Sequence, residues 1–123
     1  AYRWSEELIA KYVGHRRDEF IFATKCGSGR VLQPDGEWVQ TLDYSAKAIA
    51  PQIDRSLERL KTDHVDILLI HDPDEGATLW SPGADPFAVS HFADVMEQTY
   101  PVLDDLRSQN VIKAIGLGMN QIR

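Results

Sequence analysis

A chain of 123 residues, 43% of them hydrophobic, can bury one core but cannot hold two ordinary domains. Its formal net charge of −6 argues against nucleic acid as a partner, because proteins that bind the phosphate backbone need clustered Lys and Arg. Its single cysteine, Cys26, excludes an internal disulfide, and no apolar run approaches the length of a membrane span, so we expect a cytoplasmic protein without a membrane partner.

The N-terminal part predicts a helix followed by a strand. Ser5 can cap a helix that carries apolar residues at helical spacing and stops at Gly14. The apolar run at 20–24 predicts a strand that ends at Lys25. The first residue is not Met, and the chain starts directly beside this helix signal, so we expect a fragment of a longer protein.

The next stretch predicts a long loop and then a second helix. Glycines and a proline between 27 and about 44 are typical of a loop, and a loop of this length is more often functional than idle. Ser45 is expected to cap the helix that follows. Pro51 lies deep inside its apolar pattern and predicts a kink or a late helix start.

The run at 65–70 is the strongest strand signal. It is short, almost wholly apolar and rich in branched residues, and Asp72-Pro73-Asp74 stops it. Such a run is typical of a central strand of a parallel sheet, with His71 at its C-terminal end. In α/β folds the reactive groups sit at that end. The simpler interpretation is that His71 only ends the strand and bonds to a neighbour.

The C-terminal part repeats the alternation. A Gly- and Pro-rich loop from 76 to about 89 carries Trp80, a helix over 92–106 is interrupted at Pro101, and a strand over 112–117 precedes Asn120. The order helix, strand, helix, strand, helix, strand predicts an α/β fold with parallel strands and right-handed crossovers.

Three polar residues follow the C-terminal ends of the three predicted strands: Lys25, His71 and Asn120. Alone, Lys25 could be an exposed lysine and Asn120 a turn-forming residue. Because parallel strands end at the same edge, we expect these three side chains to face one site.

Four segments resemble, in order, those of the aldo-keto reductase family. Residues 1–9 resemble its tyrosine loop and the helix after it, 16–25 its lysine strand, 56–73 its histidine strand with the preceding helix, and 115–120 the following strand. The resemblance implies that residues 1–123 form a single domain, which is part of a (β/α)8 TIM barrel. That domain would run from about the end of strand 2 through strand 5 and be incomplete at both ends.

The resemblance also implies hydride transfer between NADP or NAD and a carbonyl or alcohol carbon. Tyr2 would be the proton donor, Lys25 would lower the pKa of that tyrosine, His71 would orient the substrate oxygen, and Asn120 would bind the nicotinamide carboxamide. No metal is implied. Some family members carry a longer tyrosine loop, and in that case Tyr2 would be a loop aromatic.

The substrate is expected to be a small carbonyl compound or sugar. Residues 69–74 and 116–121 look most like the branch that oxidises aldoses such as fucose or galactose, or pyridoxal. Trp38 and Trp80 could line a sugar site or serve as hydrophobic lid residues.

Two other classes stay open. The chain could be a catalytically inactive part-barrel that acts as a binding or scaffold module. It could also belong to a metal-dependent hydrolase with His71, Asp72 and Asp74 as ligands, although the sequence holds no His-x-His motif. The sequence decides neither between NAD and NADP nor the oligomeric state.

Overall fold

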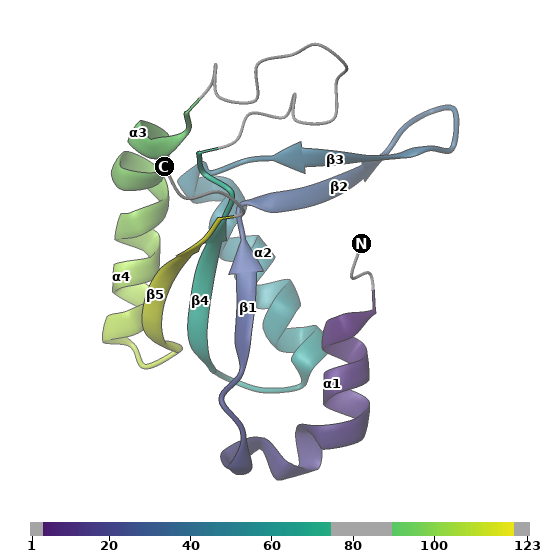
Figure 1. Cartoon of the computed structure of the whole chain (residues 1–123), viewed down its shortest axis with the longest axis vertical. Helices are drawn as coiled ribbons and strands as arrows, with labels where there is room; N and C mark the ends of the chain where they lie inside the picture. Colours follow the sequence, from purple (N-terminus) through teal and green to yellow (C-terminus); the bar gives the residue numbers. More distant parts are fainter. Residues whose placement is uncertain (1–3, 75–89, 120–123) are drawn as a thin grey trace.

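A three-stranded parallel sheet forms the centre of the protein. The computed structural model describes residues 4–74 and 90–119. The strands lie in the order β1 (Ala23–Cys26), β4 (Val65–His71) and β5 (Ile112–Gly118), and both neighbouring pairs are parallel (Figure 1). The predicted alternation of helix and strand is therefore confirmed, and the 65–70 run is the central strand.

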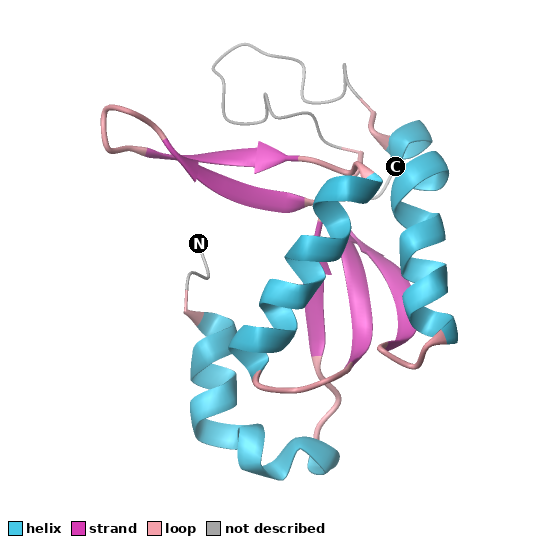
Figure 2. Cartoon of the chain, turned by 180° about the vertical axis from the view of Figure 1, so that it is seen from behind, coloured by secondary structure: helices cyan, strands magenta, loops and turns pink. Residues whose placement is uncertain are grey.

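The helices cover one face of this sheet. They are α1 (Ser5–Val13), the 3-10 segment η1 (Gly14–Glu19), α2 (Ala46–Leu60), the short α3 (Phe92–Asp94), the π-helical turn η3 (Val95–Thr99) and α4 (Tyr100–Ser108). Figure 2 shows α2 and α4 in front of the strands. Between helices and sheet lies the core, which contains Leu68 and Ile70 of β4, Ile49 and Ile53 of α2 and Leu103 of α4.

Some predicted boundaries differ from the observed ones. Trp4, and not Ser5, holds the N-cap position of α1, so Ser5 is the first helical residue. The first strand begins at Ala23, and Lys25 lies inside it, not just past its end. Helix α2 starts directly after Ser45, so the late start inferred from Pro51 is wrong. Pro51 is exposed, and water can hydrogen-bond the carbonyl group that the missing N–H leaves without its helical partner.

The helix interruption at Pro101 is confirmed. The π-helical turn η3 immediately precedes α4, in which Pro101 is the second residue. Because proline has no N–H, it cannot donate to the carbonyl four residues earlier, and a wider turn accommodates that loss.

The segment predicted as a long loop contains a β-hairpin instead. Strands β2 (Ser28–Leu32) and β3 (Trp38–Leu42) pair antiparallel, with Leu32 opposite Trp38, and the hairpin extends from the end of β1 (Figure 1). Between the strands lies a turn in which Gly36 has a φ of +87° and the Asp35 carboxylate accepts a hydrogen bond of 3.0 Å from the Glu37 N–H. The glycines and the proline marked this turn correctly, but the apolar pairs beside it were overlooked.

The amino ends of the strands are tied together by Asp66. Its carboxylate, in a residue only 8% exposed, accepts hydrogen bonds from the Arg17 guanidinium (2.9 Å), the Phe22 N–H (2.9 Å) and the Lys113 ammonium (2.6 Å). Burial raises the pKa of Asp66, but the hydrogen bonds from these groups outweigh it and hold the pKa well below its usual range. One carboxylate of β4 thus connects η1, the residue directly before β1, and β5.

We predict that Asp66→Asn lowers the free energy of unfolding by about 3 kcal/mol, because two cations lose a buried partner. The pKa of Asp66 is lower in the folded state than in the unfolded state. The stabilisation is therefore fully present above the unfolded-state pKa of about 4, and it is lost as the pH falls below that value. Urea unfolding of the whole protein at several pH values measures both effects. Asp63→Asn is the control, since the Asp63 side chain is 96% exposed. Equal midpoints for the two variants would contradict the prediction.

The other face of the sheet is open among the described residues. Side chains alternate along β4, so that Leu68 and Ile70 are buried under the helices while Ile67, Leu69 and His71 are only half-buried. On the same open face, Ala23 of β1 and Ala114 of β5 are exposed. Figure 1 looks onto this face, and β1 and β5 form the two edges of the sheet.

We expect residues 1–123, expressed alone, to be partly unfolded, oligomeric or aggregated. Two free strand edges and an uncovered half-apolar face both favour association. Light scattering coupled to size-exclusion chromatography, followed by thermal unfolding, checks this. A monomer with a sharp cooperative melt would show that the expectation is wrong.

Candidate functional site

Two of the predicted site residues meet at the carboxyl edge of the sheet. Lys25 is the third residue of β1, and His71 is the last residue of β4. The register pairs Lys25 with Leu69, two residues before His71, so both polar side chains lie on the open face. Tyr2, Asn120 and Trp80 lie outside the described residues.

The Lys25 side chain crosses the neighbouring strands. A Cβ atom added to Gly118 of β5 would lie 3.1 Å from Lys25 Cε and 3.4 Å from Leu69 Cβ. The aliphatic part of Lys25 therefore extends over Leu69 to Gly118, the residue that pairs with His71. The missing side chain at Gly118 gives Lys25 its room.

His71 lies in a partly buried, charged environment. Its side chain is 26% exposed, and its Nδ1 atom lies 3.1 Å from Oδ2 of Asp72. Burial lowers the pKa of His71, the Asp72 carboxylate raises it, and the Lys25 ammonium lowers it, with a net result below the ordinary value. These effects favour the neutral imidazole, which can donate one hydrogen bond and accept another.

A further residue of this site was missed by the sequence analysis. The Tyr44 hydroxyl donates a hydrogen bond of 2.7 Å to the carbonyl oxygen of His71. Tyr44 appeared in the sequence only as the end of a presumed loop. A large aromatic residue directly before the helix cap Ser45 was the available signal, but nothing local indicated a partner 27 residues away.

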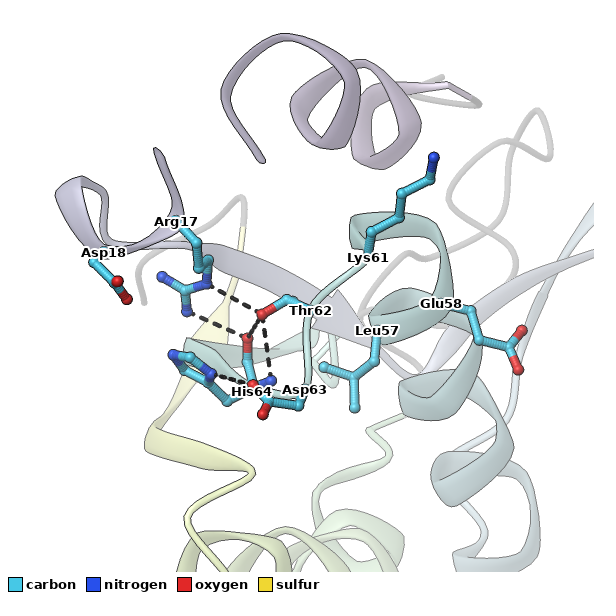
Figure 3. A pocket seen from close by; sticks show the side chains of 8 residues that line it. All are labelled: Arg17, Asp18, Leu57, Glu58, Lys61, Thr62, Asp63 and His64. Carbon is cyan, nitrogen blue, oxygen red and sulfur yellow. Dashed lines mark hydrogen bonds and ion pairs between the residues drawn. The ribbon is translucent and has the colours of Figure 1, made fainter. Parts of the chain in front are cut away.

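A surface depression lies at the opposite, amino end of the sheet. Figure 3 shows its lining, in which the Arg17 guanidinium donates hydrogen bonds to the Thr62 hydroxyl and the His64 carbonyl oxygen. These groups precede β4, whereas His71 ends it, and a strand of this length separates the two places by roughly 20 Å. The polar groups here stabilise the turn before β4 and lie far from Lys25 and His71.

The described ranges offer neither a metal-binding cluster nor a membrane-spanning helix. Within residues 4–74 and 90–119, no group of three or more His, Cys, Asp or Glu side chains could hold a metal ion, so the hydrolase hypothesis gains no support. Among the helices in these same ranges, none has the length and apolar character needed to cross a membrane.

Comparison with known sequences identifies relatives that act on sugars. The chain is 29% identical to D-threo-aldose 1-dehydrogenase of Pseudomonas sp. over 133 residues, covering 93% of this chain and 35% of that protein. It is 31% identical to L-galactose dehydrogenase of Arabidopsis thaliana over 101 residues, covering 82% of this chain and 24% of that protein. The chain thus spans about a third or less of the length of these relatives.

Solved structures resemble the fold. A putative aldo-keto reductase from Pseudomonas aeruginosa superposes with a TM-score of 0.68 at 30% identity, covering 97% of this chain and 40% of that chain. The holo form of an aldo-keto reductase from Bacillus halodurans gives a TM-score of 0.66 at 27% identity, covering 94% of this chain and 32% of that chain. The parallel sheet and its helices therefore form part of a (β/α)8 barrel, as expected. A sequence profile of the Aldo/keto reductase family matches residues 1–123, and the chain belongs to that family.

Proposed function

We propose that the barrel containing this chain is an NAD- or NADP-dependent oxidoreductase that moves hydride between the nicotinamide and a carbonyl or alcohol carbon. The observation that carries the proposal is that Lys25 and His71 lie on the same open face, at the carboxyl edge of the sheet, in a member of this family. The carboxyl edge is where barrel enzymes hold their reactive groups.

Each residue has a defined part in this proposal. Reduction of a carbonyl builds negative charge on its oxygen, which must then receive a proton. A tyrosine, with a pKa near 10, is a poor acid at neutral pH unless a cation stabilises its phenolate, which is the role of Lys25 beside Tyr2. His71 hydrogen-bonds and orients the substrate oxygen.

The described residues fit a nicotinamide on the open face. The nicotinamide supplies the hydride, whereas the protein supplies orientation and proton transfer. Gly118 leaves room for the Lys25 side chain, Ala114 of β5 is small and exposed, and among the described residues no helix or strand covers this face. Asn120, two residues beyond β5, would present its amide to the carboxamide.

The substrate is proposed to be an aldose or a similar aldehyde. Support comes from the two curated relatives, whose names state that they oxidise D-threo-aldoses and L-galactose. Trp38 on the hairpin is 48% exposed, and an aromatic face of this kind can pack against the C–H groups of a sugar. Relatives named as dehydrogenases do not favour the scaffold hypothesis.

The proposal is tested with Lys25→Met in the whole protein, assayed with aldoses and both nicotinamides. The loss of the ammonium should lower turnover. It should also shift the pH profile of the remaining activity to higher pH, because the tyrosine loses the cation that favours its phenolate. The pKa of His71 should also rise, since Lys25 lowers it in the wild type. An NMR titration of the imidazole measures the second effect.

Lys11→Met is the matched control, because Lys11 is exposed in the last turn of α1. It should leave turnover and both pH profiles unchanged. A wild-type protein without nicotinamide-linked activity, or a Lys25→Met variant that matches the wild type, would refute the proposed function.

We also predict that Gly118→Ala reduces turnover by displacing Lys25. The new methyl group would stand 3.1 Å from Lys25 Cε, so the lysine must move. The pH profile should shift in the same direction as in Lys25→Met, by a smaller amount. Gly14→Ala is the comparison, because Gly14 lies in η1 and its methyl group would meet only Ala10 Cβ, at 4.0 Å, so the profile should stay in place. Identical profiles for the wild type and Gly118→Ala would contradict this.

A further inference from the structure

We propose that Tyr44 is a positioning residue for His71, whose hydroxyl holds the end of β4 in the conformation that presents the imidazole on the open face. This inference rests on the proposed function, because the proposed function is what gives His71 a role in turnover. Tyr44 lies between β3 and α2 and is only 3% exposed, so it acts from inside the protein.

The Tyr44 hydroxyl contacts two consecutive carbonyl groups. Its single hydrogen is shared between the carbonyl oxygen of His71, at 2.7 Å, and that of Asp72, at 3.1 Å. In an extended strand, consecutive carbonyl groups point in opposite directions, so one donor cannot reach both. They converge here because Asp72 has a φ of +43°, a left-handed conformation that a residue with a side chain rarely adopts.

The bend at Asp72 is held from both sides. Its N–H donates a hydrogen bond of 3.0 Å to the carbonyl oxygen of Gly118 in β5, while Tyr44 holds the carbonyl groups. The same bend sets the place of the Asp72 carboxylate, 3.1 Å from His71 Nδ1. A change in the bend therefore alters both the direction of the imidazole and the charge beside it.

The ring of Tyr44 is enclosed by its neighbours, and its backbone is held separately by a hydrogen bond. Its carbonyl oxygen accepts a hydrogen bond of 2.6 Å from the hydroxyl of Thr99, which is fully buried in η3. Its ring lies 5.0 Å from the ring of His91, and on the other side a Cβ atom added to Gly27 would lie only 2.5 Å from its Cε1 atom. A phenylalanine would fill this space equally well, so packing alone does not explain the hydroxyl.

The test compares Tyr44→Phe with Thr99→Val in the whole protein. Each variant removes one buried hydroxyl and leaves a carbonyl oxygen without its donor, so both should lose stability. Only Tyr44→Phe removes a contact to the strand end that carries His71. We expect its kcat to fall roughly ten- to a hundredfold with little change in cofactor affinity, because small displacements of an orienting group are costly. The kcat of Thr99→Val should change less than about twofold on the same grounds.

A second readout does not depend on turnover. The imidazole NMR signals of His71, assigned with His71→Gln, should shift in Tyr44→Phe and stay in place in Thr99→Val. If the His71 signals stay in place in Tyr44→Phe, or shift equally in Thr99→Val, the positioning role is wrong. If they shift while His71→Gln retains full turnover, Tyr44 still positions His71 and only the proposed function fails.

Gly27→Ala tests the same contact from the opposite side. The added methyl group must displace the Tyr44 ring and draw its hydroxyl away from the two carbonyl groups. We expect the same shift of the His71 signals, and this variant decides the question if Tyr44→Phe does not fold. Unchanged signals in a folded Gly27→Ala protein would overturn the proposal.

Discussion

The other elements take their position from β4, which is hydrogen-bonded to a parallel strand along each of its edges. Both ends of this strand are also fixed by side chains. At its start, Asp66 accepts hydrogen bonds from groups of η1, of Phe22 just before β1, and of β5. At its end Tyr44 binds the carbonyl groups of His71 and Asp72. A strand restrained at both ends and along both edges is a rigid support, which the proposed role of His71 in orienting the substrate oxygen requires.

The two faces of the sheet divide stability from function. Toward the helices, β4 presents Leu68 and Ile70, which are almost fully buried and supply the apolar contacts of the core. Toward the open side, the neighbouring strands present small residues, and across them lies the long side chain of Lys25. Among the described residues the core lies on the helix side, and the cation and the imidazole lie at the carboxyl edge of the opposite face.

The sequence predicted those features that depend on neighbouring residues. A continuous apolar run is enough to indicate a buried central strand, and the polar residues after it locate its end at His71. The hairpin at 28–42 was missed because its Gly and Pro residues outweighed the apolar pairs beside the turn. The roles of Tyr44 and Gly118 could not be predicted, because each depends on a contact between segments far apart in the chain, which no local pattern encodes.

The charges at the carboxyl edge explain why two basic side chains can share one site. Burial already disfavours the charged form of His71, and the nearby Lys25 ammonium disfavours it further, while Asp72 only partly opposes them. Lys25 is therefore the cation of this pair, and His71 offers hydrogen bonds without competing for the charge. Under the proposed function, this division lets the lysine stabilise a phenolate while the imidazole orients the substrate oxygen. A charged imidazole would instead place a second cation near Lys25, and like charges disfavour each other. An uncharged His71 therefore suits this proposed division of roles between the two residues.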